Sequence, residues 1–292
     1  KGTEAGKLLK IQGGIIMVVQ HNLTAMNANR QLGIVTNNQA KATEKLSSGY
    51  KINRAGDDAA GLSISEKMRS QIRGLNKAST NAEDGVSLIQ TAEGALNETH
   101  SILQRMNELA TQAANDTNTS TDRKAIKAEL TALTSELNRI ASTTQFNTMN
   151  LLDGTFTGKN LQVGALSGQK ISISISGMNA NKLGLAGTNG KMTIAVSTFA
   201  AAGNAMTKIQ SAITKVSTQR SALGAIQNRL EHTIANLDTT SENTSSAESR
   251  IRDTDMADAM VEYSKNQILA QAGQSMLAQA NQATQGVLSL LG

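Results

Sequence analysis

Residues 62–114 read LSISEKMRSQIRGLNKASTNAEDGVSLIQTAEGALNETHSILQRMNELATQAA, and this stretch decides the fold. Apolar or small side chains recur in it at every seventh position: Met68, Leu75, Ala82, Ile89, Leu96, Leu103 and Ala110. A spacing of 3.5 residues per turn places these side chains along one seam of a helix, and such a seam packs on partner helices. The sequence therefore predicts one helix of roughly 80 Å that belongs to a coiled-coil bundle.

Two later segments carry the same kind of repeat and are the natural partners of the first helix. One has apolar side chains at alternating steps of four and three, and the other has them at steps of seven: Ile126, Leu130, Leu133, Leu137 and Ile140, then Ile209, Val216, Leu223, Leu230 and Leu237. Each apolar stripe is narrow, so the helices must pack on one another to be stable. We expect the shared core to include Leu75, Ile89, Leu96, Leu103, Leu130, Leu137, Val216, Leu223 and Leu230.

The middle of the chain has a different period. Three isoleucines alternate there with three serines, which predicts a strand: Ile171, Ser172, Ile173, Ser174, Ile175 and Ser176. Glycines punctuate the surrounding residues as turns, so residues 151–198 are predicted to form a small β-rich cap of one or two hairpins. The fold class is mainly α: an elongated antiparallel coiled-coil bundle of long helices from both chain ends, with a small β-hairpin cap in the middle.

The two ends of the chain, about 17–47 and 251–292, favour helix but have weak apolar faces. Ala, Asn and Gln fill most positions, so a lone subunit offers little area to bury. We expect both ends to be disordered or loosely helical in the free monomer and to order when neighbours supply the missing contacts. The residues expected to drive this assembly are Leu23, Met26, Met260, Ile268, Met276, Val287, Leu288, Leu290 and Leu291.

The composition excludes several classes of protein. Aromatic residues make up 2% of the 292 residues, and proline, tryptophan and cysteine are absent. Few aromatics suit thin bundles, and the lack of proline permits long uninterrupted helices. Without cysteine there is no disulfide framework and no thiolate metal site. The net charge of +5 is not gathered in a basic stripe with stacking aromatics, so no nucleic-acid partner is expected.

The first residues differ in character from the rest of the chain. The sequence from Met17 onward has the character of the beginning of a protein, so we expect residues 1–16 to be a non-native leader. The apolar stretch 15–19 is too short for a secretory signal. Since no run of about eighteen apolar residues occurs, no membrane insertion is expected. If it is secreted, we expect the chain to leave the cell without cleavage of a signal peptide.

Candidate catalytic or metal-binding groups are scarce. The three histidines are far apart and lack the spacing of a zinc hydrolase: His21, His100 and His232. The adjacent carboxylates Asp57 and Asp58 either bind a cation or cap the helix that starts near residue 62, and capping is the simpler interpretation. We therefore expect no enzymatic activity, no cofactor and no metal.

Several short motifs follow one another along residues 17–292: QHNL (20–23), AMN (25–27), EKLSSG (44–49), AGDDAAGL (55–62), QFN (145–147), RDTDMA (252–257), LAQANQ (277–282) and VLSLL (287–291). Together they resemble the terminal signatures of bacterial flagellins, the secreted subunits of self-assembling helical filaments. A hook-associated or junction protein, which shares the terminal helices, and a secreted receptor ligand or adhesin are the alternatives. The long central helices and the short cap favour an ordinary flagellin.

The resemblance implies a layered subunit and a set of partners. An inner layer (D0) lines the filament channel, a coiled-coil layer (D1) surrounds it, and a spoke joins them. The expected parts are 17–47 and 251–292 for the inner layer, 48–61 for the spoke, and 62–150, 151–198 and 199–250 for the surrounding layer with its cap. The implied partners are other copies of the subunit, the flagellar cap and hook–filament junction proteins, and an export chaperone. The implied location is the extracellular flagellum.

The resemblance further implies recognition by an innate-immune Toll-like receptor of the host. The motif LQRMNELA (103–110) is similar to the recognised surface, and the implied contact residues are Gln104, Arg105, Glu108, Leu109, Gln112 and Glu129. In this interpretation Arg105 makes bidentate pairs and Leu109 acts as an apolar plug. Asn107 departs from the arginine common at its place. The residues alone favour another interpretation, in which Leu109 adds to a helix seam and Arg105 is a solvated charge.

Overall fold

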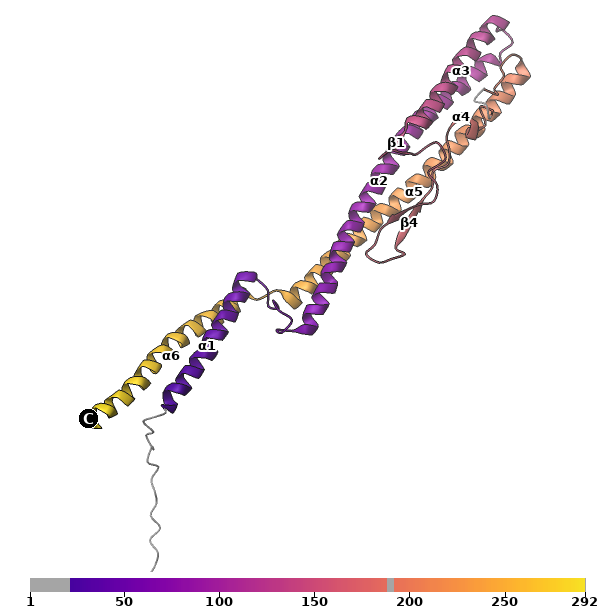
Figure 1. The fold of residues 1–292 in the computed structure, drawn as a ribbon. Coiled ribbons are helices and arrows are strands. Elements are labelled where there is room, and N and C mark those ends of the chain that lie inside the picture. The colour runs from indigo at the N-terminus through magenta and orange to yellow at the C-terminus, as the bar shows by residue number, and fades with distance from the viewer. Residues whose placement is uncertain (1–21, 188–191, 292) are drawn as a thin grey trace, which may run out of the picture. The chain divides into compact units, whose positions relative to one another are not determined.

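The computed structural model describes residues 22–187 and 192–291, with side chains described as far as residue 283. The elements of this part are, in chain order, α1 (Leu23–Ser48), α2 (Ala59–Ala113), α3 (Ser120–Thr143), β1 (Gln145–Phe146), β2 (Met149–Asn150), β3 (Lys159–Gln162), β4 (Lys170–Ile173), α4 (Ala180–Leu183), α5 (Phe199–Arg252) and α6 (Met256–Leu291). The mainly α class with small antiparallel hairpins is confirmed (Figure 1).

The described chain forms two compact units. The central unit comprises residues 66–247, and the terminal unit comprises residues 22–65 together with 248–291. Both units therefore combine segments from the two halves of the chain.

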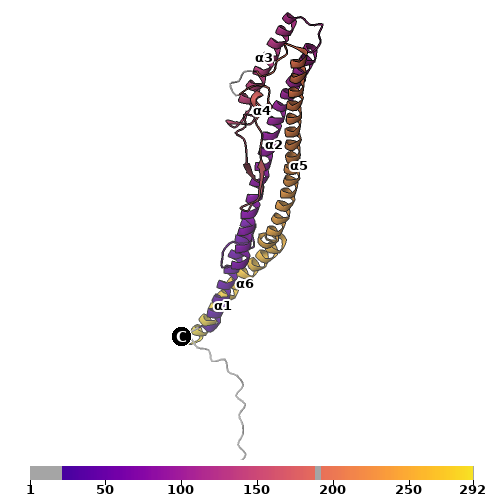
Figure 2. The ribbon, with the colours of Figure 1, turned by 90° about the vertical axis from the view of Figure 1, so that its right-hand side faces the viewer.

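Three helices of the central unit, α2, α3 and α5, lie side by side (Figure 2). Glu93 of α2 pairs with Arg220 of α5 at 3.6 Å, and Ser79 donates to Asp238 at 3.0 Å. Residue numbers fall along α2 as they rise along α5, so these two helices are antiparallel. After a short turn α3 also runs back along α2.

The core of the central unit lies where these three helices pack on one another. All nine residues that the heptad pattern placed in the core are buried, and the buried cluster extends to Ile126, Ile209 and the apolar side chains of the cap. A fully buried aliphatic side chain of this kind contributes about 1.5–3 kcal/mol through the hydrophobic effect. The bundle therefore rests on aliphatic packing, as the scarcity of aromatic residues requires.

The cap contains two hairpins and starts earlier than predicted. The strands β1 and β2 pair in register Phe146 with Met149, inside the range 62–150 that was expected to be helical. The two residues between them, Asn147 and Thr148, have φ of 46° and 63°. Two successive positive φ angles form the tight turn that suits the twist of a hairpin, and asparagine tolerates this conformation well.

The second hairpin pairs β3 with β4, in register Leu161 with Ile171. As the alternation predicted, the isoleucines of the IleSer repeat are buried and its serines are exposed. Two glycines of α2 allow the hairpin to lie against that helix. A Cβ at Gly85 would overlap the side chain of Leu161, and one at Gly74 would lie 2.8 Å from the Cβ of Ala165.

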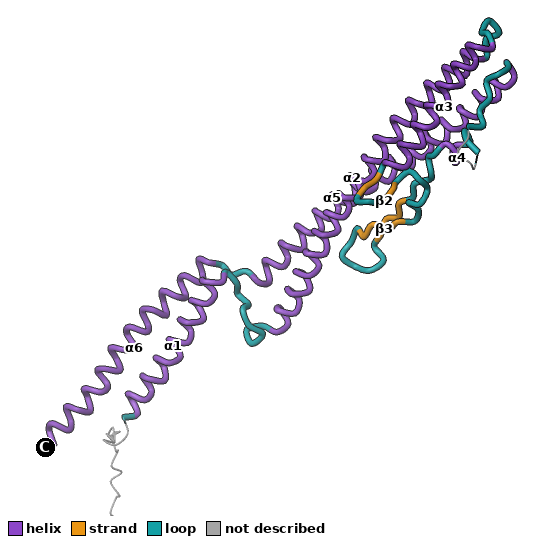
Figure 3. The backbone as a smooth tube through the Cα atoms, turned by 45° about the horizontal axis from the view of Figure 1, so that its top comes forward, coloured by secondary structure: helices purple, strands orange, loops and turns teal. Residues whose placement is uncertain are grey.

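In the terminal unit α1 and α6 are antiparallel helices that pack on each other (Figure 3). The side-chain amide of Asn22 donates to the carbonyl of Ala280 at 2.9 Å, and Tyr50 forms a β-bridge with Asp253 at the other end of the pair. A Cβ at Gly273 would lie 3.2 Å from Cδ1 of Leu32, so the glycine leaves room for this leucine side chain between the helices. We expected these ends to be loose in the free monomer; in the described part of the chain they form the continuous helices α1 and α6.

The described residues of the two helices that are buried are small or polar, namely Ala42, Ala259, Asn266 and Ala270, and larger seam residues such as Leu32 are only partly buried. Such a seam buries much less apolar area than the central core. The first helix was predicted over 17–47; it is described from Leu23 to Ser48, and residues 17–21 and the predicted leader 1–16 lie outside the described residues.

Candidate functional site

A cluster of three charged side chains joins α2 to α3 on the surface of the central unit. The guanidinium of Arg105 donates to Oε1 of Glu129 from Nε at 3.1 Å and from Nη2 at 3.0 Å, and Nη1 donates to Glu108 at 3.2 Å. The side chains remain 52%, 45% and 68% exposed for Arg105, Glu129 and Glu108. Antiparallel packing of two helices thus brings together residues 24 positions apart in sequence.

Electrostatics fix the charge state of this cluster. The hydrogen bonds that Arg105 donates to Glu129, and after them the one that it donates to Glu108, raise the pKa of Arg105 above its ordinary value. The arginine is therefore charged at every physiological pH, with its planar donor fork held by the carboxylate of a second helix. The arrangement offers a partner a pre-ordered cation flanked by carboxylates.

Leu109 does not lie on this surface, which corrects its predicted role as an apolar plug. The side chain is only 2% exposed and belongs to the core of the bundle. It follows Met106 and precedes Ala113 on a second buried seam of α2, because a central helix of three must bury more than one side. Of the other implied contacts, Gln104 lies 3.1 Å from the His100 ring nitrogen, and both Gln104 and Gln112 are exposed.

A polar groove of about 630 Å³ adjoins the charged cluster, with Glu108 and Gln112 in its lining. Asn107, another lining residue, has its side-chain oxygen buried without a hydrogen-bond partner in the described part of the chain. An unpaired buried acceptor is costly, so this oxygen favours any partner that supplies a donor. Sequence reasoning noted Asn107 only as a departure from arginine.

The terminal unit has a second candidate surface, which is apolar. We use the name terminal apolar face for the large exposed apolar side chains of α1 and α6 together: Leu23, Met26, Ile34, Met256, Met260, Val261, Ile268, Leu269 and Met276. The five assembly residues predicted within the described part, from Leu23 to Met276, are all on it. The side chains of the other four lie outside the described residues: Val287, Leu288, Leu290 and Leu291.

Comparison with known proteins gives one consistent match at both ends of the chain. The bacterial flagellin N-terminal helical region matches residues 19–157, and the bacterial flagellin C-terminal helical region matches residues 206–291. The chain belongs to the bacterial flagellin family. It is accordingly a structural subunit of the flagellar filament and not an enzyme.

Individual flagellins are similar over nearly the whole chain. A flagellin of Halalkalibacterium halodurans is 55% identical over 275 residues, covering 94% of this chain and 100% of that protein. The flagellin of Bacillus subtilis is 50% identical over 303 residues, with the same coverage of both chains. The crystal structure of Bacillus cereus flagellin is 33% identical, covers 54% of this chain and 88% of that chain, and gives a TM-score of 0.46.

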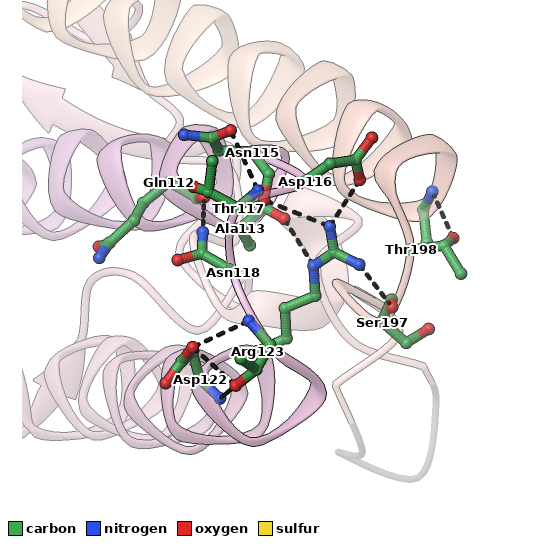
Figure 4. A network of polar contacts seen from close by, with 12 residues as sticks. Gln112, Ala113, Asn115, Asp116, Thr117, Asn118, Asp122, Arg123, Ser197 and Thr198 are labelled. Carbon is green, nitrogen blue, oxygen red and sulfur yellow. Dashed lines mark hydrogen bonds and ion pairs between the residues drawn. The ribbon is translucent and has the colours of Figure 1, made fainter.

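The turn between α2 and α3 in this flagellin is held by Arg123 (Figure 4). Its guanidinium donates to the carbonyls of Ala113 at 3.1 Å, Asn115 at 3.3 Å and Ser197 at 3.4 Å, and pairs with Asp116 at 2.9 Å. The last carbonyls of a helix have no donors within the helix, and the Arg123 side chain supplies donors at the end of α2. The same side chain connects this helix end to the segment before α5. No sequence pattern signals this contact, because the partners are up to 74 residues away.

Of the two adjacent aspartates of the predicted spoke, Asp57 holds the turn before α2 and Asp58 caps that helix. Asp57 accepts from the backbone N–H groups of Arg54 at 3.0 Å and Asn53 at 3.2 Å, and these bonds, that of Arg54 first, lower its pKa. Asp58 accepts from Gly61 at 2.9 Å and so caps α2, which begins at Ala59 instead of near residue 62. Within the described residues no group of three His, Asp or Glu side chains is placed to hold a metal.

The helices of the described chain also differ from membrane-spanning segments. None of them combines the length and the hydropathy that crossing a membrane needs.

Proposed function

We propose that this flagellin subunit enters the filament through the terminal apolar face. The observation that supports the proposal is the contrast between the inside and the outside of the α1–α6 pair. The only residues of the two helices that are buried within the described part are alanines and an asparagine, aliphatic side chains such as Leu32 are partly buried between the helices, and other large apolar side chains remain exposed. Exposed apolar patches of this kind are characteristic of association surfaces. Polymerisation buries these side chains against other copies.

The two units correspond to the layers of the filament in this proposal. The terminal unit supplies the inner layer at the channel, the central unit supplies the surrounding layer, and residues 49–58 between α1 and α2 supply the spoke. The chain is secreted through the flagellar export channel. Its other partners are the flagellar cap and hook–filament junction proteins and an export chaperone.

A charge placed on the terminal apolar face tests the assembly proposal. Met276→Glu inserts a carboxylate where the side chain is exposed in the lone subunit, and polymerisation would then bury it unpaired. Filaments should be absent by negative-stain electron microscopy, while the helical circular dichroism of the monomer is unchanged. The matched variant Gln274→Glu adds the same charge to an exposed polar position of α6 and should still assemble. Normal filaments from Met276→Glu would refute the proposal.

A second proposal concerns the charged cluster of the central unit, which we assign to recognition by a host Toll-like receptor. The pre-ordered guanidinium of Arg105 between Glu129 and Glu108 supports it, because such forks give geometric specificity at protein interfaces. The exposed amides of Gln104 and Gln112 and the polar groove extend the same surface. Leu109 takes no direct part, since it is buried.

Receptor binding is tested best at Glu129, away from the core. Glu129→Lys should weaken binding to an immobilised receptor ectodomain by about tenfold or more and leave polymerisation unchanged. Glu136→Lys is the matched control, because it also breaks an exposed α3 ion pair, with Arg139. The exchange Arg105→Glu with Glu129→Arg retains an ion pair across the helices and should still fail to bind. Equal binding by Glu129→Lys and Glu136→Lys would contradict the assignment.

A further inference from the structure

A cavity of about 560 Å³ opens between the cap and the outer side of α5. Its walls come from the loop at Gly154, the segment from Ser176 to Leu183 that includes α4, and one face of α5 from Thr214 to Ala222. All of these residues belong to the central unit. The volume is in the range of small-molecule pockets, and neither the filament surface nor the receptor surface described above includes it.

The charged side chains that line this cavity are basic. Lys182 and Lys215 are in its lining, and none of the lining residues that the structure describes is acidic. The ammonium of Lys215 donates to the carbonyl of Lys182 at 3.1 Å and is 3.4 Å from the carbonyl of Leu183, so it is anchored at the end of α4. An ammonium has three donors, and the anchored group still has capacity to donate into the cavity.

The walls around the two lysines are held in place. The side-chain amide of Gln219 accepts from the backbone N–H of Ser176 at 3.2 Å and donates to the carbonyl of Ser174 at 3.3 Å, which ties the cap segment to α5. Gly177 allows the stem of Lys182 to pass close to the backbone, because a Cβ there would lie 3.0 Å from Cγ of the lysine. The lysine stem is thus guided along the cavity wall.

Part of the cavity lining is apolar. Met178 and Leu183 line it and are both almost completely buried. The site therefore combines one anchored ammonium, a second lysine side chain and several hydroxyl groups with a small aliphatic part. A monovalent anion with a short aliphatic stem can place its charge beside the lysines and its carbon atoms against the apolar residues. A multiply charged anion would leave part of its charge against the apolar residues.

We infer that this cavity binds a carboxylate on a short aliphatic stem, with the ammonium groups of Lys182 and Lys215 as donors. Two sources have this chemistry. One is a small free carboxylic acid, and the other is an Asp or Glu side chain of a neighbouring subunit in the filament. The inference is independent of the receptor proposal.

The free source is tested on the full-length, isotope-labelled monomer, at a concentration below the onset of polymerisation. Sodium butyrate should shift the amide signals of residues 176–183 and 214–222, and butyramide, which has the same shape without the charge, should not. Lys182→Gln should weaken butyrate binding by about fivefold, the size of an exposed charge contact. Lys170→Gln removes an exposed charge from the cap outside the cavity lining and should leave the binding unchanged.

The neighbour source is tested by polymerisation of the same two variants. If a neighbour supplies the carboxylate, Lys182→Gln should raise the critical concentration for filament growth by about fivefold relative to Lys170→Gln. Butyrate binding, this rise, or both would support the inference and identify the source. If butyrate and butyramide behave alike and the two variants polymerise equally well, the inference is overturned.

Discussion

Ile268 allows the assembly proposal to be tested quantitatively. Its side chain is 67% exposed on α6. Full burial of an isoleucine side chain contributes about 1.5–3 kcal/mol, so roughly 1–2 kcal/mol of this is left to be gained on association. Ile268→Ala removes most of that gain. Because alanine is the better helix former, the substitution does not weaken α6 itself.

The expected result is a change in assembly without a change in folding. Since each 1.4 kcal/mol is tenfold in an equilibrium constant, the critical concentration for polymerisation should rise about five- to thirtyfold. The measurement is the unpolymerised protein left after sedimentation of filaments, over a range of total concentrations. Thermal unfolding of the monomer, followed by circular dichroism, should match the parent.

Gln274→Ala is the matched control, because it changes an exposed polar side chain of the same helix. It should leave the critical concentration within about twofold of the parent, as expected of a surface substitution. If Ile268→Ala also stays within that range, the terminal apolar face does not drive assembly at this position. If it lowers the stability of the monomer, the side chain contributes to folding, and the separation of the two roles is wrong.

Three further outcomes follow from the central unit. Leu223 is fully buried, so Leu223→Ala should lower the free energy of unfolding by about 2–5 kcal/mol in denaturant titrations, while the exposed Ser221→Ala should not. Arg123→Met should accelerate amide exchange in the turn 114–119, and exchange as slow as in the parent would contradict the clamp. The pKa of Asp122 is held below its ordinary value of 3.8, first by the hydroxyl and then by the backbone N–H of Thr119. The ionised Asp122 therefore stabilises the fold fully above pH 3.8, and this stabilisation is lost as the pH falls through the lower pKa of the folded state. Acid should speed amide exchange in the first turn of α3 in the parent protein and much less in Asp122→Asn.

The heptad and period-two patterns predicted the parts of the fold that depend on local burial. Along α2 and α5 the seam positions, such as Leu96 and Leu223, are buried, and the isoleucines at 171, 173 and 175 face the core. A residue whose burial depends on helical or strand periodicity can be found from its own neighbours in sequence. The early start of the cap was missed because a two-residue turn at Asn147 and Thr148 gives a much weaker pattern than a long helix.

Leu109 illustrates an error that the sequence contained the means to avoid. Ile102, Met106, Leu109 and Ala113 have steps of four, three and four, which mark a second apolar seam beside the heptad column. A helix that packs on two others buries both seams, so Leu109 is in the core. The residues alone favoured this seam position, and the role of apolar plug came only from the resemblance to flagellins.

The long helices, their heptad seams and, through motifs at both ends, the family of the chain could be predicted from the sequence. Tertiary structure alone decided which polar and charged groups meet: Arg105 with Glu129, Arg123 with the carbonyl of Ser197, and Lys215 with the end of α4. The physical reason is that periodic burial is a property of one helix, repeated every few residues. The partner of an exposed side chain depends instead on the register in which distant helices pack, and that register is set by the summed contacts of the whole core.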